Sequence, residues 1–229
     1  MKKLVIGLCT VSTRRVNYLP ATLNSLLCNM TENNKSDILI RVYNCDCKGK
    51  KSNPVKGFEK EIQKGLIEVI RVDDHPDFID LPNNFGDDND RVQWRTKQCY
   101  DYSEAFRLSY GIGEYYMHIE DDIIAGKDFD SYVFREIRNH ENWCSIHMAE
   151  GGFIGWVYHN NDLPRLSALF REFRDEMPPD WLIEFYVHIK TFTGKNHIKT
   201  DYSIFQHVGV ERTLKNSIQP VVFDNFIGT

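Results

Sequence analysis

Three consecutive carboxylates, Glu120, Asp121 and Asp122, follow directly on the apolar segment 115–119. Adjacent carboxylates repel one another, and a divalent cation relieves that repulsion. Mg²⁺ and Mn²⁺ prefer oxygen ligands in octahedral geometry, and one or two carboxylates typically hold them while substrate phosphates complete the shell. The triplet therefore predicts a divalent-cation site for a diphosphate. The alternative is an acidic turn that caps a following helix.

The place of the triplet along the chain favours the cation site. Residues 115–119 are expected to form a buried strand, and ligands of open parallel sheets bind outside the carboxyl ends of the strands. Side chains alternate along extended backbone, so Glu120 and Asp122 are expected to face one side and Asp121 the other. Two carboxylates can then face one ligand.

The elements that must position the triplet follow from the pattern of apolar residues. Short apolar runs alternate with longer amphipathic stretches, which is typical of an α/β domain with a largely parallel sheet. Strands are expected at 4–10, 37–44, 67–72 and 115–119, and helices at 20–28, 56–64 and 94–108, with Gly111 and Gly113 ending the last helix. The polar segment 73–91 is too long for a simple connector and is expected to be a solvated loop.

The composition indicates one soluble globular domain. The chain has 229 residues and a formal net charge of -5, which argues against sequence-independent nucleic-acid binding. No apolar run approaches the about 20 residues of a transmembrane helix, and the first apolar run is expected to be a strand and not a signal peptide. The 6 cysteines show no zinc-type spacing, so reduced thiols and a soluble, cytoplasmic protein are expected.

Six ordered segments carry a resemblance to a known family. The first pairs Thr10-Val11 with Tyr18-Leu19-x-x-Thr22-Leu23-x-Ser25-Leu26; the others are Arg91-Val92-Gln93-Trp94-Arg95-Thr96-Lys97-Gln98 with Asp101-Tyr102, Tyr115-Tyr116-x-x-x-Glu120-Asp121-Asp122-Ile123-Ile124, Gly152-Phe153-Ile154-Gly155, Pro179-Asp180-Trp181-Leu182 and Phe205-Gln206-His207-Val208-Gly209. In order and over nearly the whole chain, they resemble the catalytic core of the N-acetylglucosaminyltransferase IV family, Golgi enzymes that branch N-glycans. The anchor, stem and lectin-like domain of that family have no counterpart in these 229 residues.

The resemblance implies a GT-A type fold for nucleotide-diphospho-sugar transfer, an α/β fold with a single Rossmann-like domain and a mostly parallel central sheet. Residues 1–229 would form one catalytic domain, with a nucleotide-binding half at 1–125 and an acceptor-side half at 126–229. It also implies a UDP-sugar donor, which in the family is UDP-N-acetylglucosamine, a glycan acceptor, Mn²⁺ or Mg²⁺ as cofactor, and inversion at the anomeric carbon. The oligomeric state is left open.

Two site residues are assigned by the positions that they occupy in these segments. Inverting transfer needs a base for the acceptor hydroxyl, and a carboxylate is the usual choice. Asp180 resembles the family position for that base, with a simple helix N-cap as the alternative. His207 resembles the C-terminal histidine of GT-A folds and is expected to bind the metal or contact the diphosphate, with a core histidine as the alternative.

The nucleotide contacts are assigned in the same way. Asp122 is expected to bind the metal directly, while Glu120 and Asp121 approach the ribose or metal-bound water. Thr10 and Arg14 at the end of the first strand are expected near the uridine. Asp46, at the end of the next strand, could accept from the uracil N–H, and an ordinary loop aspartate is the alternative.

Arg95 and Lys97 are expected to neutralise charge on the departing diphosphate, with solvent-exposed helix residues as the alternative. Gly151, Gly152 and Gly155 are expected to let the backbone approach the donor sugar, because glycine has no Cβ, and a tight turn is the alternative.

Other functions use similar residues. A metal-dependent phosphotransferase or nucleotidyltransferase also needs paired carboxylates and a divalent ion, but the chain has no phosphate-binding Gly-x-x-x-x-Gly-Lys-Ser/Thr loop. A transferase for another UDP-sugar, or an inactive protein that binds nucleotide sugars or glycans, stays open. In the inactive protein, Trp94, Trp156 and Trp181 would supply stacking surfaces.

Overall fold

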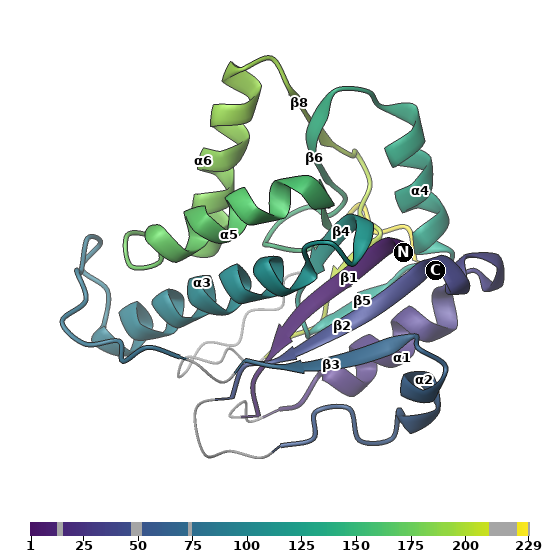
Figure 1. The fold of residues 1–229 in the computed structure, drawn as a ribbon, viewed down its shortest axis with the longest axis horizontal. Coiled ribbons are helices and arrows are strands. Elements are labelled where there is room, and N and C mark those ends of the chain that lie inside the picture. The colour runs from purple at the N-terminus through teal and green to yellow at the C-terminus, as the bar shows by residue number, and fades with distance from the viewer. Residues whose placement is uncertain (13–15, 47–51, 73–74, 211–223, 229) are drawn as a thin grey trace.

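A seven-stranded sheet forms the centre of the chain (Figure 1). The computed structural model describes residues 1–12, 16–46, 52–72, 75–210 and 224–228. The order of strands across the sheet is β3-β2-β1-β4-β7-β6-β8. Their bounds are β1 Lys2–Thr10, β2 Ile38–Asn44, β3 Ile67–Arg71, β4 Gly113–Ile119, β6 Trp143–His147, β7 Trp156–His159 and β8 Asn196–Lys199.

All strands of the sheet except β7 run in one direction. β1 pairs parallel to β2 and β4, and β2 pairs parallel to β3. β7 runs antiparallel to both β4 and β6, and β8 is parallel to β6. The carboxyl ends of β1, β2 and β4 therefore meet at one edge, where Thr10, Asn44 and Ile119 end their strands.

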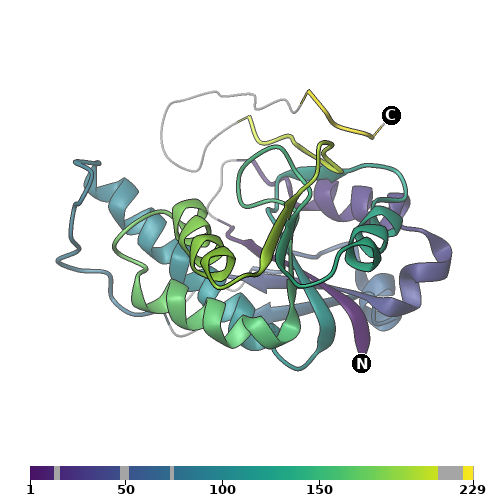
Figure 2. The ribbon, with the colours of Figure 1, turned by 90° about the horizontal axis from the view of Figure 1, so that it is seen from above.

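Helices cover both faces of the sheet, as Figure 2 shows from above, with α3, α5 and α6 on one side and α1 and α4 on the other. The helices are α1 Leu19–Asn29, α2 Glu59–Gln63, α3 Asn89–Ser109, α4 Phe129–Asn139, α5 Leu163–Glu172 and α6 Pro179–Phe192, with 3-10 turns η1 Glu32–Asp37 and η2 Asn160–Asp162. None of the helices in the described residues has the length and apolar character needed to cross a bilayer.

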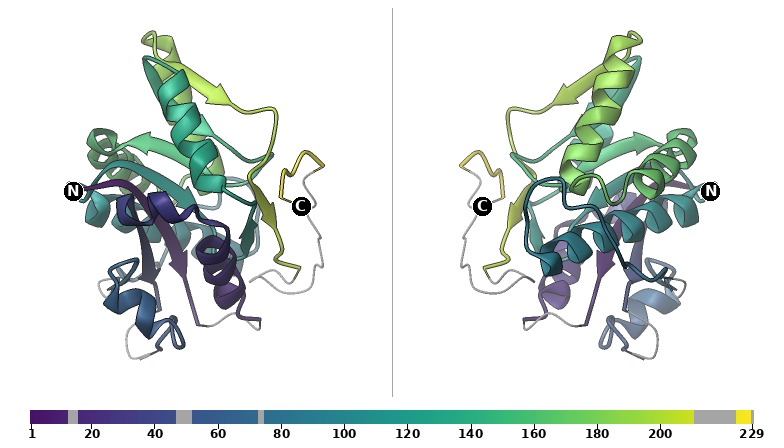
Figure 3. Two further views of the ribbon diagram at one scale, coloured as in Figure 1. Left: turned by 90° about the vertical axis from the view of Figure 1, so that its right-hand side faces the viewer. Right: turned by 90° about the vertical axis from the view of Figure 1, so that its left-hand side faces the viewer.

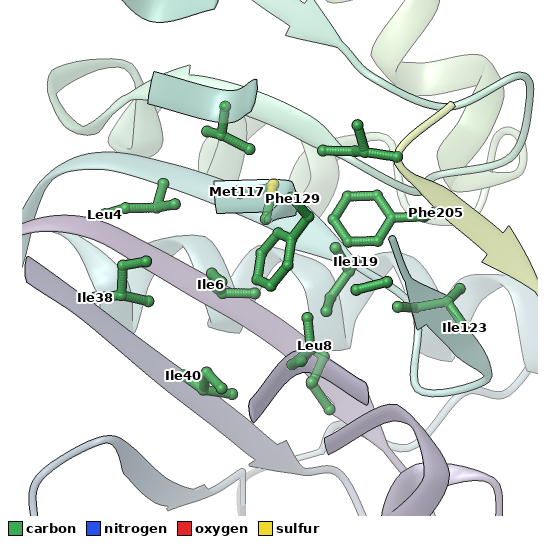
Figure 4. Packing of buried hydrophobic residues seen from close by; sticks show 14 of the residues in the cluster. Leu4, Ile6, Leu8, Ile38, Ile40, Met117, Ile119, Ile123, Phe129 and Phe205 are labelled. Atoms are coloured by element: carbon green, nitrogen blue, oxygen red, sulfur yellow. The ribbon is translucent and has the colours of Figure 1, made fainter. Parts of the chain in front are cut away.

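The side chains of β1 alternate between the two layers, as the twofold period of a strand requires. Leu4, Ile6 and Leu8 pack with α1 and α4, whereas Val5 packs with α3, α5 and α6. Figure 4 shows the first of these clusters, in which Leu8 lies near Ile119 at the end of β4. The apolar packing thus extends up to the residue before the acidic triplet.

Most of the predicted elements are confirmed. The strands expected at 4–10, 37–44, 67–72 and 115–119 are β1, β2, β3 and β4, and the helix expected at 20–28 is α1. The helix expected at 94–108 begins earlier, at Asn89, so the end of the predicted loop 73–91 is helical; the described residues 75–88 of that loop contain no regular element.

Two predictions about glycines and helix ends were wrong in detail. The helix expected at 56–64 shrinks to α2, because Gly57 adopts a φ of 98° that no right-handed helix contains. Gly113 does not end α3 but begins β4, where an added Cβ would meet Val5 at 2.8 Å. Gly111, with a φ of 80°, makes the turn between them.

Gly7 gives a test of this packing. An added Cβ would overlap the ring and hydroxyl of Tyr116, which is fully buried on the neighbouring strand. We expect Gly7→Ala to lower the free energy of unfolding by about 1–3 kcal/mol, because a packed core resists added volume, as measured by urea denaturation. Gly151→Ala is the control, since its Cβ would meet no atom of the described residues within 4 Å; an equal loss in both variants would contradict the prediction.

Candidate functional site

The acidic triplet forms the turn between β4 and the short strand β5 Ile123–Ala125. β5 does not join the main sheet but pairs antiparallel with β9 Phe205–His207, which places Ile123 opposite His207. In Figure 3 the segment that carries β9 lies beside the main sheet and not within it. The element after the triplet is thus a strand, so the alternative of an acidic turn that caps a helix was wrong.

Pairing of β5 with β9 brings His207 to the acidic turn. The Nε2 atom of His207 lies 3.5 Å from Oδ2 of Asp122 and 4.0 Å from Oε2 of Glu120. One ligand atom from each of these three residues lies within 4.8 Å of the other two. The three side chains can therefore reach a single ion. The His207 side chain is 18% exposed, and its binding of a metal or a diphosphate stays a prediction beside the alternative of a core histidine.

Asp121 points to a different neighbour. Its Oδ2 atom accepts a hydrogen bond of 2.6 Å from Oγ1 of Thr10, at the end of β1. Glu120 and Asp122 therefore share one cluster while Asp121 faces β1, which is the alternation that extended backbone predicts. Thr10 lies where it was expected, at the carboxyl end of its strand.

Helix α1 holds the backbone of the turn and of β5. The buried hydroxyl oxygen of Thr22 lies 2.9 Å from the carbonyl oxygen of Asp121 and 2.8 Å from that of Ile123, which share its one proton, and it accepts the N–H of Ile123. Ser25 accepts the N–H of Ala125, and the Asn29 amide donates to the Ala125 carbonyl. Among the described residues β5 pairs with β9 alone, and these α1 side chains bond the backbone of β5 and of the turn, so α1 fixes the position of the acidic turn.

A glycine close to Asp122 completes the turn. The backbone N–H of Val208 donates to the Asp122 carbonyl at 2.8 Å. A Cβ added to the next residue, Gly209, would overlap the Asp122 carboxylate. Gly209 thus leaves the room in which that carboxylate lies beside His207.

A pocket opens next to the triplet at the carboxyl ends of β1 and β2. It is lined by Cys9, Thr10, Val11, Cys45, Trp94, Gln98, Asp101, Tyr102, Glu120 and Asp121. Trp94, Gln98 and Tyr102 come from one face of α3, at helical spacing, and the Gln98 amide donates to the Tyr102 hydroxyl at 2.9 Å. Burial raises the pKa of Tyr102 well above its usual value, and the nearby Glu120 carboxylate adds to the shift. Tyr102 therefore stays protonated, so its hydroxyl is a neutral hydrogen-bonding group.

Asp46 lies two residues after the end of β2 and is buried next to hydroxyl groups. Its Oδ1 atom accepts from the N–H of Ser12 at 2.7 Å and from the Ser12 hydroxyl at 2.9 Å, and Oδ2 accepts from Ser52. Asp46 therefore ties the end of β1 to the end of β2, and a contact with uracil stays a prediction. Arg14, expected beside it, lies outside the described residues.

Arg95 and Lys97 are both held in ion pairs. The buried Arg95 guanidinium donates to Asp87 at 2.6 Å and lies over the Phe85 ring, which places it under the loop before α3. Lys97 donates to Asp101 at 2.5 Å and to the Cys45 carbonyl at 2.8 Å, beside the pocket. Neither is the solvent-exposed helix residue of the alternative interpretation, and a role toward the diphosphate stays a prediction for both.

Gly152 and Gly155 each adopt a φ of 69°, so the tight-turn interpretation applies to both. A Cβ on Gly152 would lie 3.8 Å from Oε1 of Glu120, so this turn approaches the triplet. Gly155 instead packs against Phe205, where a Cβ would meet the ring at 3.0 Å. Gly151 precedes Gly152, and a Cβ on it would meet no atom of the described residues within 4 Å.

Asp180 lies in the first turn of α6, whose N-cap position is Pro178. Desolvation by the surrounding atoms raises the pKa of its carboxyl, although the backbone N–H groups of Asp180 and Trp181 and the Arg91 guanidinium act in the opposite direction. The carboxylate thus interacts with the helix terminus without being the N-cap. Arg91 belongs to α3, the helix that lines the pocket, and the role of Asp180 as a base stays a prediction.

Several residues around the pocket had no place among the predicted site residues. Gln98 and Tyr102 belong to a segment that carried the resemblance, and their spacing from Trp94 places all three on one helix face. Cys9 and Cys45 gave no signal in the sequence, because apolar strand residues look alike whether they line a core or a pocket. Burial raises the pKa of both thiols, which are therefore neutral.

Sequence similarity to known proteins extends over nearly the whole chain. The family model for the "MGAT4 conserved region" matches residues 1–226. The alpha-1,3-mannosyl-glycoprotein 4-beta-N-acetylglucosaminyltransferase B of Danio rerio is 31% identical over 97% of this chain and 45% of its own length. The alpha-1,6-mannosyl-glycoprotein 4-beta-N-acetylglucosaminyltransferase of Gallus gallus is 30% identical over 98% of this chain and 50% of its own length. The chain thus spans about half the length of the curated relatives it matches.

Solved structures share the fold at low sequence identity. S. aureus TarS aligns with a TM-score of 0.53 and 12% identity, over 91% of this chain and 37% of TarS. The mannosyltransferase PcManGT from Pyrobaculum calidifontis, solved in complex with GDP-Man and Mn²⁺, aligns with a TM-score of 0.56 and 7% identity, over 86% of this chain and 54% of its own. The predicted GT-A type α/β fold is confirmed.

The support of the acidic turn by α1 can be tested through stability. Thr22→Val keeps the shape of the side chain but leaves the buried N–H of Ile123 without its acceptor. We expect the free energy of unfolding to fall by about 1–3 kcal/mol, the cost of a buried unsatisfied donor, as measured by urea denaturation. Thr191→Val, at an exposed position of α6, is the control, and a Thr22 variant as stable as this control would argue against the role of α1.

Proposed function

Because the chain belongs to the family defined by the MGAT4 conserved region, we propose that it transfers a sugar, most simply N-acetylglucosamine, from a UDP-sugar to a hydroxyl of a mannose-containing glycan. Residues 1–125 would bind the nucleotide and residues 126–229 would face the acceptor. Inversion at the anomeric carbon, with Asp180 as the base, is part of the proposal.

The observation that carries the proposal is the meeting of Glu120, Asp122 and His207 beside the pocket at the carboxyl edge of the sheet. These residues come from segments far apart in the sequence. Ligands of open α/β sheets bind at this edge. A nucleotide in the pocket would therefore have its phosphates next to the acidic turn.

The three side chains fit a divalent cation. They offer two carboxylates and one imidazole, and their ligand atoms lie within 4.8 Å of one another. Carboxylate oxygens suit Mg²⁺ and Mn²⁺, and imidazole is accepted better by Mn²⁺. Asp122 and His207 would hold the ion directly, and Glu120 would bind it or its water. A bound cation would supply charge neutralisation for a diphosphate leaving group.

The donor contacts would come from the pocket walls. Thr10 orients Asp121 through its hydrogen bond, and Asp121 would approach the ribose hydroxyls. The Lys97 ammonium, held against Asp101, keeps positive charge next to a pocket that is also lined by the carboxylates of Glu120 and Asp121. Gly152 would let the backbone approach the donor sugar near Glu120.

Asp180 would remove the proton from the acceptor hydroxyl. A base must be ionised and must have a pKa near the working pH, and desolvation raises the pKa of this carboxyl in that direction.

A transferase for another UDP-sugar and a non-catalytic nucleotide-sugar or glycan-binding protein are the alternatives. A phosphotransferase would release ADP, and a nucleotidyltransferase would release pyrophosphate, in place of UDP.

The cation and donor are tested together by UDP release from a panel of UDP-sugars, with and without mannose and mannose-terminated glycopeptides. We expect release to need Mn²⁺ or Mg²⁺ and to stop with EDTA. Asp122→Asn should weaken Mn²⁺ binding at least about 10-fold, as measured by calorimetry. Even the loss of a residue that only hydrogen-bonds to a metal ligand lowers metal affinity by about that much. Glu172→Gln on exposed α5 is the control. Turnover of no UDP-sugar, or turnover without metal, would contradict the proposal.

The base is tested by Asp180→Asn. We expect kcat to fall about 100-fold or more, with little change in the affinity for Mn²⁺ and UDP. In the unchanged protein, kcat/KM should fall as the pH drops through the raised pKa of Asp180, because protonation removes the base; this limb should lie above the ordinary aspartate range. Glu184→Gln, one turn further along α6, should keep full activity. Unchanged kcat in Asp180→Asn would eliminate this residue as the base.

A further inference from the structure

Two half-exposed aromatic rings lie next to Asp180. Trp181 follows Asp180 in the first turn of α6 and is 49% exposed, and Phe85, from the loop before α3, is 47% exposed. Their ring centroids are 5.1 Å apart and their planes meet at 83°. Large apolar side chains are usually covered, so a pair held in this geometry at the surface is a candidate binding surface.

The rings are held in place from below and from the side. The buried Arg95 guanidinium lies 5.0 Å from the centroid of Phe85, and its Nη1 donates to Asp87 at 2.6 Å. The Asn84 amide donates to the carbonyl of Glu176 at 3.2 Å and to its carboxylate at 2.8 Å, which joins the loop to the segment before α6. These contacts therefore hold Phe85 and Trp181 side by side although they belong to different segments.

The groups around the rings favour a sugar as the ligand. A pyranose presents C–H groups on its faces, which pack on the electron-rich face of an aromatic ring, and hydroxyls at its edges. Glu176, Asp180 and the half-exposed Arg91 provide hydrogen-bonding groups next to the rings. Further along α6, Phe185, Ile189 and Phe192 are also exposed, and they continue the apolar stripe away from these polar groups.

We propose that Trp181 and Phe85 form an acceptor subsite, in which a pyranose ring of the acceptor glycan stacks and so presents its hydroxyl to Asp180. The inference rests on the proposed transfer reaction and adds to it the residues that select the acceptor. The subsite binds sugar through Trp181 and Phe85 and needs no contact with Glu120, Asp122 or His207.

The test compares Trp181→Ala, Phe85→Ala and Trp181→Phe with Phe185→Ala, which removes an equally exposed ring one turn along the same helix. With the mannose-terminated glycopeptide as acceptor, Trp181→Ala and Phe85→Ala should raise its KM about 5- to 10-fold, the value of a stacked ring. Trp181→Phe should stay within about 3-fold of the unchanged protein. Calorimetry should find the affinity for UDP with Mn²⁺ unchanged, and Phe185→Ala should behave like the unchanged protein.

Each outcome separates this inference from the proposed function. Transfer by the unchanged protein with an unaltered acceptor KM in both alanine variants would overturn the subsite alone. An equal rise of KM in Phe185→Ala would assign acceptor binding to the whole α6 stripe and would also overturn it. If no acceptor supports transfer, the proposed function fails, and binding of the glycopeptide to the same variants by calorimetry tests the subsite directly. If Trp181→Ala does not fold, the comparison of Phe85→Ala with Phe185→Ala decides.

Discussion

Three negative charges in adjacent residues constrain everything around the turn after β4. The structure divides the charges between two directions. Asp121 turns back to the Thr10 hydroxyl on β1, while Glu120 and Asp122 face His207. Such a division needs a backbone that cannot relax, and α1 provides it through Thr22, which holds the turn by hydrogen bonds on both sides of Asp122. The small β5–β9 sheet also holds the turn, because it pairs Ile123 with His207. The missing Cβ of Gly209 leaves space for the Asp122 carboxylate.

Helix α3 connects the two sides of the proposed site. One stripe of the helix, with Trp94, Gln98 and Tyr102, lines the pocket next to the triplet. The neighbouring stripe, with Arg91 and Arg95, holds the loop that carries Phe85 and lies near Asp180. A nucleotide and an acceptor bound on the two sides would thus be aligned by one rigid element. The aromatic and polar groups on the acceptor side belong to loops and to a helix end, which can change in sequence without disturbing the strands beneath the pocket.

The sequence predicted the parts of the site that depend on local pattern. β1 to β4 follow from apolar runs, and the triplet could be placed at a strand end because the run before it is apolar. The resemblance placed His207 beside the triplet, and the pairing of β5 with β9 agrees with that placement. Sequence could not predict that Arg95 would lie under Phe85, or that Thr22 would hydrogen-bond the backbone of β5. Both contacts join segments far apart in the chain, and the local apolar pattern of each segment is the same with or without the contact. The length of α2 was missed for a local reason, the left-handed backbone of Gly57.

The spacing of Glu120, Asp122 and His207 along the chain has a consequence for synthesis of the protein. Thr10 and Thr22 leave the ribosome first, the acidic turn follows about a hundred residues later, and His207 follows almost as far behind the turn. Chains grow at about 5–20 residues per second, so β1, β2 and β4 can pair while the turn still lacks His207. During that interval the acidic turn has been made but His207 has not, so Glu120 and Asp122 are without the imidazole that lies beside them in the folded chain. The group of three side chains is complete only when β9 has been made and has paired with β5.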